Sequence, residues 1–285
     1  MATPRVLRYL FLLLLFCLLS VVSASASQGS IFVYHRFGDA RYPSTNIELK
    51  VFAAQLDYLI EQRIPVLPLS QVVTRLRRGA ELPERYVVLT VDDGYASFLS
   101  GAMPLLRQRQ LPVTLFVSSR SVGARGYLDW EQLRILQREG VEVGNHSHSH
   151  PHLVNLFLEG GEVAVRRELE SSQALFEQQL GVRPRLFAYP FGETLPAISR
   201  MVEASDFLGA TVQHSGVVTE TSDLWHLPRF AMGGAYATLV GFKEKSRMSA
   251  LPVTVESPSD GVIGRCNPPE LVLRLAAEAS VGVSQ

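Results

Sequence analysis

Short continuous apolar runs alternate along the chain with segments in which apolar residues recur every three or four positions. A continuous run is typical of a strand buried on both faces of a parallel sheet, and the three-to-four period is typical of an amphipathic helix. The longest helical pattern covers residues 162–180 and ends at Gly181, which can close a helix in the left-handed conformation. The predicted strands are residues 31–35, 65–69, 87–91, 112–117, 141–145, 186–189 and 207–212, with an extended segment at 224–230. This alternation predicts an α/β protein, either a parallel (β/α) barrel or an open sheet.

Two adjacent carboxylates, Asp92 and Asp93, follow the predicted strand 87–91. In folds built from parallel strands, ligands and catalytic groups gather at the carboxyl ends of the strands. Neighbouring carboxylates repel each other, so a positive group is expected beside them, and a metal ion is the usual one. The alternative is a polar turn that closes the strand and caps the next helix.

Histidines follow the predicted strand 141–145 directly. Four of the seven histidines of the chain lie in this tract, at positions 146, 148, 150 and 152. Imidazole is the commonest metal ligand near neutral pH, and two imidazoles with one carboxylate leave open positions for a reacting molecule. Spacing alone does not say which of these histidines bind a metal.

Together the two clusters resemble a known enzyme family. The segments Thr90-Val91-Asp92-Asp93-Gly94 and His146-Ser147-His148-Ser149-His150 are similar to the first two motifs of polysaccharide deacetylases, carbohydrate esterase family four. The resemblance covers roughly residues 31–248 and implies a distorted (β/α) barrel of fewer than eight parallel strands. It also implies a catalytic base, Asp92, and three ligands of one divalent metal ion: Asp93, His146 and His150. Zinc is expected first on ligand type, and iron, cobalt or nickel would also suit the set.

The chain departs from the family pattern at the third motif. The family has Arg-x-Pro-Tyr there, whereas this chain has Ala188 at the arginine position. The resemblance still implies that the main-chain N–H of Phe191 points at the developing oxyanion. Arg229 is the predicted replacement for the missing guanidinium; the alternative for Arg229 is a surface charge or a structural ion pair.

A second departure concerns the general acid. The family's Leu-x-His motif is missing, because no histidine follows His226. Tyr34-His35 resembles the Tyr-His near the N-terminus of the permuted branch, the biofilm-exopolysaccharide deacetylases. His35 is therefore the predicted acid and His226 the alternative. Among the aromatic residues near the motifs, Tyr189 and Trp225 are predicted to contact sugar rings.

Composition limits the class of protein and its partners. With 285 residues and 47% hydrophobic content, the chain can bury one large core. Lys+Arg and Asp+Glu both number 27, and this balance argues against non-specific binding to nucleic acid or anionic lipid. An N-acetylated polysaccharide substrate is compatible with it.

The first residues read as a secretory signal. Arg5 and Arg8 precede an apolar run at 9–22, which is shorter than the ~20 residues of a membrane span, and small residues follow at 23–26. The prediction is a signal peptide at 1–26 and a periplasmic or secreted protein without a stable membrane span; the alternative is an uncleaved anchor. Residues 27–250 form the predicted catalytic domain, and 251–285 an extension or incomplete module. Cys266 would be the only cysteine left, which excludes an internal disulfide.

The predicted function is a metal-dependent hydrolase that removes N-acetyl groups from N-acetylglucosamine-containing polysaccharide. Two alternatives remain open. One is a metal-dependent esterase acting on small acetylated molecules or acetylxylan, and the other is a secreted carbohydrate-binding protein that has lost catalysis.

Overall fold

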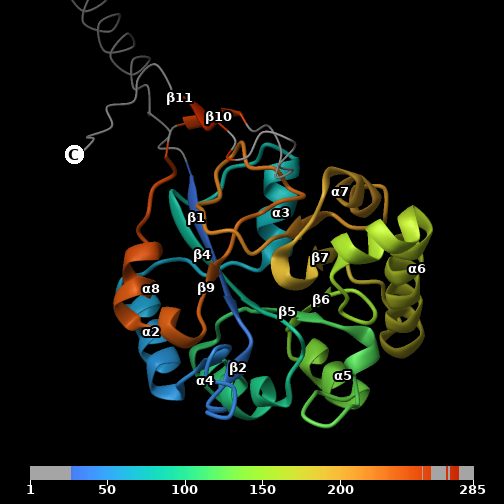
Figure 1. Ribbon diagram of the computed structural model, residues 1–285. Coiled ribbons are helices and arrows are strands. Elements are labelled where there is room, and N and C mark those ends of the chain that lie inside the picture. Colours follow the sequence, from blue (N-terminus) through green and yellow to red (C-terminus); the bar gives the residue numbers. More distant parts are fainter. Residues whose placement is uncertain (1–26, 252, 258–267, 269, 276–285) are drawn as a thin grey trace, which may run out of the picture.

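The computed structural model of the protein describes residues 27–251, 253–257, 268 and 270–275 (Figure 1). The predicted signal peptide at 1–26 and Cys266 lie outside these residues. Among the described helices, none combines the length and the apolar character that crossing a membrane requires.

A curled sheet of seven parallel strands forms the centre of the fold (Figure 1). The strand order is β8-β7-β6-β5-β4-β1-β9. This arrangement confirms the prediction of a distorted barrel with fewer than eight parallel strands. The strands are β1 (Gln28–Tyr34), β4 (Arg85–Val91), β5 (Thr114–Val117), β6 (Glu142–Asn145), β7 (Leu186–Ala188), β8 (Gly209–Thr211) and β9 (Phe230–Ala231).

Helices pack around the sheet, with α2 and α8 on one flank and α5 and α6 on the other (Figure 1). The predicted helix at 162–180 is the C-terminal part of α6, which starts earlier and has non-helical dihedral angles at Gly161. Gly181 closes it in the left-handed conformation, as predicted. The helices are α2 (Leu49–Glu61), α3 (Leu69–Arg77), α4 (Met103–Arg109), α5 (Trp130–Arg138), α6 (Leu153–Leu180), α7 (Pro196–Glu203) and α8 (Leu239–Lys245).

The central strands are buried on both faces, which explains their continuous apolar sequences. In β1, Phe32 and Tyr34 pack into the hydrophobic cluster that contains residues of α2 and α8. Ile31, on the opposite face of the same strand, packs with residues of α3. The predicted strand at 65–69 is wrong: Val66 makes one isolated bridge to Val87, and α3 already begins at Leu69.

Two small sheets and four short helical turns complete the described structure. β10 and β11 are antiparallel and fall within the predicted C-terminal extension. Ala250 donates a hydrogen bond to Gln28 at the start of β1, so this end of the chain leaves the domain beside the amino ends of the strands. These elements are β2 (Arg36–Phe37), β3 (Asn46–Ile47), β10 (Val253–Ser257), β11 (Val272–Leu275), η1 (Phe98–Ala102), η2 (Ser119–Ser121), η3 (Pro190–Gly192) and η4 (Gly234–Tyr236).

Candidate active site

The predicted polar residues meet at the carboxyl ends of neighbouring strands. β1 and β4 pair in a register that sets Tyr34 opposite Val91, so His35 and Asp92 emerge side by side. The Asp92 amide donates to the Tyr34 carbonyl at 2.9 Å. His146 follows β6 and is held there by a 3.0 Å hydrogen bond from its amide to the Val117 carbonyl. Residues that are distant in sequence thus share one edge of the sheet.

Asp93, His146 and His150 bring three donor atoms to one point. Asp93 Oδ1 lies 3.5 Å from His146 Nε2 and 3.3 Å from His150 Nε2. The two Nε2 atoms are 3.2 Å apart. Ligand atoms bound at about 2.0–2.1 Å around a tetrahedral zinc ion would be separated by about 3.4 Å. The spacing therefore fits one divalent cation held by three protein ligands.

The surroundings of His146 also suit a metal ligand. Its Nδ1 lies 2.7 Å from the Ala188 carbonyl, which fixes the ring and directs Nε2 towards Asp93. The side chain of Asn145 accepts a hydrogen bond from the Ser147 amide at 2.8 Å. Ser147 Oγ in turn accepts one from the His150 amide at 3.1 Å. These bonds shape the turn that brings the two imidazoles together.

Backbone strain is concentrated at this edge of the sheet. Asp93, His150 and Phe191 have positive φ angles of 75°, 56° and 59°. Such angles are uncommon for residues with a side chain and collect at functional sites. Gly192 follows with φ 73°, and a Cβ there would meet Gln213 at 2.3 Å, so the turn after β7 needs glycine.

Asp92 is almost fully buried and pairs with Arg229. Arg229 donates two parallel hydrogen bonds of 2.7 Å to the carboxylate, and its Nε donates to the Val212 carbonyl at 3.0 Å. Burial acts to raise the pKa of Asp92, but the charges of Arg229 and His146 outweigh it and hold the pKa below its usual value. Asp92 is consequently ionised at neutral pH, with Oδ2 4.0 Å from His146 Nε2.

Replacing Arg229 is expected to destabilise the protein strongly. Arg229→Gln leaves the Asp92 carboxylate buried without its partner, which should lower the free energy of unfolding by about 3–5 kcal/mol. The folded-state pKa of Asp92 is depressed, so the pair stabilises the protein above the ordinary carboxyl pKa and loses this contribution as the pH falls through the folded-state value. The difference between wild type and variant should therefore shrink in acid.

Denaturant unfolding at pH 7 and in acid measures this effect. The double variant Asp92→Asn/Arg229→Gln is the matched control, because it removes both charges and should recover part of the lost stability. A loss below about 1 kcal/mol for Arg229→Gln would contradict a buried pair of this strength.

His35 lines the same cavity as Asp92 and Asp93. Burial lowers the pKa of His35; Asp92 and Asp93 act in the opposite direction but do not restore it to the usual value. The alternative acid, His226, is placed elsewhere. Its ring bonds Asp223 at 2.7 Å and Ser199 at 2.7 Å, and it does not line this cavity. The structure therefore brings His35, and not His226, to this cavity.

The two aromatic residues predicted to contact sugar also lie outside this cavity. Tyr189 is fully buried, and packs edge-on against Phe187. Trp225 packs at the margin of the same hydrophobic cluster, 6.0 Å from the Arg77 guanidinium, and does not line the cavity. The structure therefore does not bring either ring into this cavity, although both are close to a motif in sequence.

Other residues occupy the cavity wall. Its volume is about 540 Å³, and Tyr95 and Phe191 line it as aromatic residues adjoining the motifs. Sequence reasoning missed Tyr236, Gln213 and Thr45, which the loops after β9 and β8 and before β3 bring to this edge. Tyr236 is 66% exposed, so its ring is available to a sugar. The sequence around it carries no motif that could have identified it.

Comparisons with known proteins agree with this geometry. Residues 79–212 match the family model described as polysaccharide deacetylase. The matched segment is a polysaccharide deacetylase domain. The matched range contains Asp92, Asp93, His146 and His150 but neither His35 nor Arg229.

Individual relatives extend the likeness beyond that range. The Bacillus subtilis protein YxkH, whose name assigns it to the polysaccharide deacetylases, is 22% identical over 199 residues, 70% of this chain and 69% of its own. A poly-beta-1,6-N-acetyl-D-glucosamine N-deacetylase of Staphylococcus aureus is 21% identical over 233 residues, 75% of this chain and 79% of its own. The Streptococcus pyogenes deacetylase PplD, solved with acetate, superposes with a TM-score of 0.70 at 19% identity, covering 78% of this chain and all of that one. These likenesses support the deacetylase fold over most of the described residues.

Proposed function

We propose that this protein is a metal-dependent hydrolase that removes N-acetyl groups from N-acetylglucosamine residues of a polysaccharide. One observation carries the proposal: the three potential metal ligands Asp93, His146 and His150 converge beside Asp92, a buried, ionised carboxylate that is not needed as a ligand. A protein that only binds carbohydrate has no use for that second carboxylate. The name of the Staphylococcus aureus relative supports an N-acetylglucosamine polymer as the substrate.

Asp93, His146 and His150 would hold the metal ion. When bound, a divalent ion supplies Lewis acidity, which polarises the acetyl carbonyl and lowers the pKa of the attacking water. Asp93 suits the ligand role because its pKa is held well below the usual value. Burial acts to raise this pKa, but the hydrogen bonds from His146 and His150 outweigh burial and lower it. Zinc is the first expectation for this ligand set, ahead of iron, cobalt or nickel.

Asp92 would act as general base. It accepts a proton from water as the water oxygen bonds to the acetyl carbon, and Arg229 holds the carboxylate in position for this step. The main-chain N–H of Phe191 would stabilise the negative charge that develops on the carbonyl oxygen. The positive φ angle of Phe191 supports this role, since residues in such conformations collect at functional sites.

His35 would donate a proton to the departing amine nitrogen as the carbon–nitrogen bond breaks, giving acetate and a free amine. Its lowered pKa leaves only a minority of molecules protonated near pH 7, so the protonated ring is the scarce reactant in this step. Release of the proton from Asp92 and uptake of one by His35 from solvent close the cycle.

The proposed substrate is encountered outside the cytoplasm. The apolar run at 9–22 between basic and small residues supports export by a signal peptide, to the periplasm or the exterior. The balanced charge of the chain supports a polysaccharide partner over nucleic acid.

Acetate release across several acetylated substrates tests the function. Poly-β-1,6-N-acetylglucosamine, chitin oligomers and peptidoglycan should include at least one polymer from which the protein releases acetate, and a chelator should abolish the release until metal is restored. Acetylxylan and a small acetyl ester are the comparison substrates. Release only from the esters would replace the proposal with a metal-dependent esterase, and no release from any substrate would favour a binding protein.

A further inference from the structure

A second, larger cavity adjoins the candidate active site. It has a volume of about 820 Å³ and is lined by residues of β2, the loop after it, the start of η1 and the loop at 125–127. Tyr95 lines both cavities. In sequence, the proposed acid His35 is followed directly by Arg36, which lines the second cavity. A chain of sugars bound at one cavity can therefore extend into the other.

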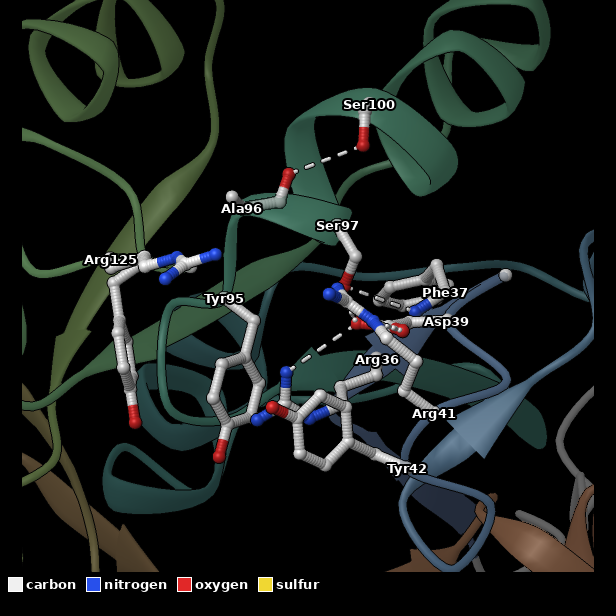
Figure 2. A pocket seen from close by; sticks show the side chains of 13 residues that line it. Arg36, Phe37, Asp39, Arg41, Tyr42, Tyr95, Ala96, Ser97, Ser100 and Arg125 are labelled. Carbon is white, nitrogen blue, oxygen red and sulfur yellow. Dashed lines mark hydrogen bonds and ion pairs between the residues drawn. The ribbon is translucent and has the colours of Figure 1, made fainter.

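Arg36 is held between two tyrosine rings in this cavity (Figure 2). Its guanidinium carbon lies 3.3 Å from the centre of the Tyr95 ring and 3.7 Å from that of Tyr42. Only 12% of the side chain is exposed. Stacking on both faces fixes the plane of the guanidinium and leaves only its edge for hydrogen bonding.

That edge forms one long ion pair, with Asp39, and no hydrogen bond to the described residues (Figure 2). Within the described part of the chain, no group accepts a hydrogen bond from the Arg36 side chain, and the nearest carboxylate oxygen, on Asp39, is 3.8 Å away. Asp39 is already engaged by Arg41 through two hydrogen bonds of 2.8 and 3.0 Å. A guanidinium carries five N–H donors, so a largely buried one whose only anionic neighbour is a shared carboxylate at 3.8 Å can still donate hydrogen bonds to a bound anion.

The net positive charge of the cavity lining also favours an anionic ligand. Arg36, Arg41 and Arg125 line it, against Asp39 as the one carboxylate among the lining residues. Figure 2 shows Arg125 across Tyr95 from Arg36 and Arg41. Arg125 is exposed and forms no ion pair or hydrogen bond with another described residue. Its charge is free to act on a ligand in the cavity.

We propose that this cavity is a subsite for a carboxylate or phosphate group carried by a sugar next to the residue that is deacetylated. This inference rests on the proposed function, which supplies the polymer. It specifies an anionic glycan as the substrate, in preference to a neutral one. The Arg36 edge would form paired hydrogen bonds with the anion, as guanidinium groups do with carboxylates and phosphates, and Arg125 would add long-range attraction.

Equilibrium binding tests the subsite without depending on catalysis. Three N-acetylglucosamine oligomers of equal length are compared by calorimetry: one neutral, one oxidised to carboxylates at C6 and one phosphorylated at C6. The Asp92→Asn chain is used so that the acetyl groups stay intact. An anionic oligomer should bind about 10-fold more tightly than the neutral one, the scale of a charge-assisted pair, and high salt should reduce the difference. The carboxylated and phosphorylated arms identify which anion is preferred.

Variants of the two arginines locate the effect. Arg36→Gln should abolish the preference for the anionic oligomer, and Arg125→Gln should reduce it. Arg78→Gln is the matched control, since Arg78 is an exposed arginine outside both cavities and should leave the preference unchanged. Equal binding of neutral and anionic oligomers, or a preference that survives both cavity variants, would overturn the subsite. A preserved preference in a protein that releases no acetate would instead refute only the proposed function.

Discussion

Asp92→Asn is expected to lower kcat for acetate release by at least ~100-fold while the metal content stays near that of the wild type. The amide keeps the size of the side chain but has no lone pair basic enough to accept the water's proton, and general-base catalysis typically contributes 10²–10⁴-fold. Asp92 Oδ2 is 4.0 Å from His146 Nε2, whereas Asp93 Oδ1 lies within 3.5 Å of both His146 Nε2 and His150 Nε2. The change should therefore affect proton transfer and spare metal binding.

Steady-state kinetics and metal analysis of the same preparations check this result. Asp223→Asn is the matched control: it makes the same replacement in a carboxylate that contacts a histidine, His226, outside the cavity. Activity of that variant should stay close to the wild-type value. Full activity in Asp92→Asn would show that another group is the base, and loss of its metal would show that Asp92 is a ligand.

The sequence predicts most of the fold and the centre of the site because both depend on local signals. Continuous apolar runs such as β4 identify buried parallel strands, and polar residues immediately after them must emerge at the carboxyl edge. Asp92, Asp93 and His146 each come directly after a strand, so their meeting follows from strand order alone. The family resemblance then separates His150 from its neighbours in the histidine tract.

Long-range packing decides what the sequence leaves open. Arg229 is 137 residues from Asp92, and only the return of β9 alongside β1 brings its guanidinium to that carboxylate. Tyr189 follows β7, as the predicted oxyanion turn does, but its ring is buried in the core. The unpredicted Tyr236, in the short helical turn η4, lines the cavity instead. The cavity that contains Arg36 is likewise not predicted from the sequence, because its walls come from three separate segments, 36–42, 95–100 and 125–127.

The metal ligands underlie every step proposed for this protein, and replacing one of them should have a very large effect. His146→Ala removes one of three donor atoms. Loss of even an outer-shell partner typically weakens metal binding 10–100-fold, so we expect loss of a ligand to cost more than about 100-fold. His148→Ala is the matched control from the same tract. The His148 ring bonds Ser119 at 2.9 Å and lies outside the three-residue cluster.

The proposed metal site is tested by elemental analysis after dialysis, which measures the metal content per chain in wild type, His146→Ala and His148→Ala. We expect about one divalent ion per chain in the wild type and in His148→Ala, and almost none in a folded His146→Ala protein. Wild-type metal content in His146→Ala, or loss of the ion from His148→Ala instead, would contradict the proposed site.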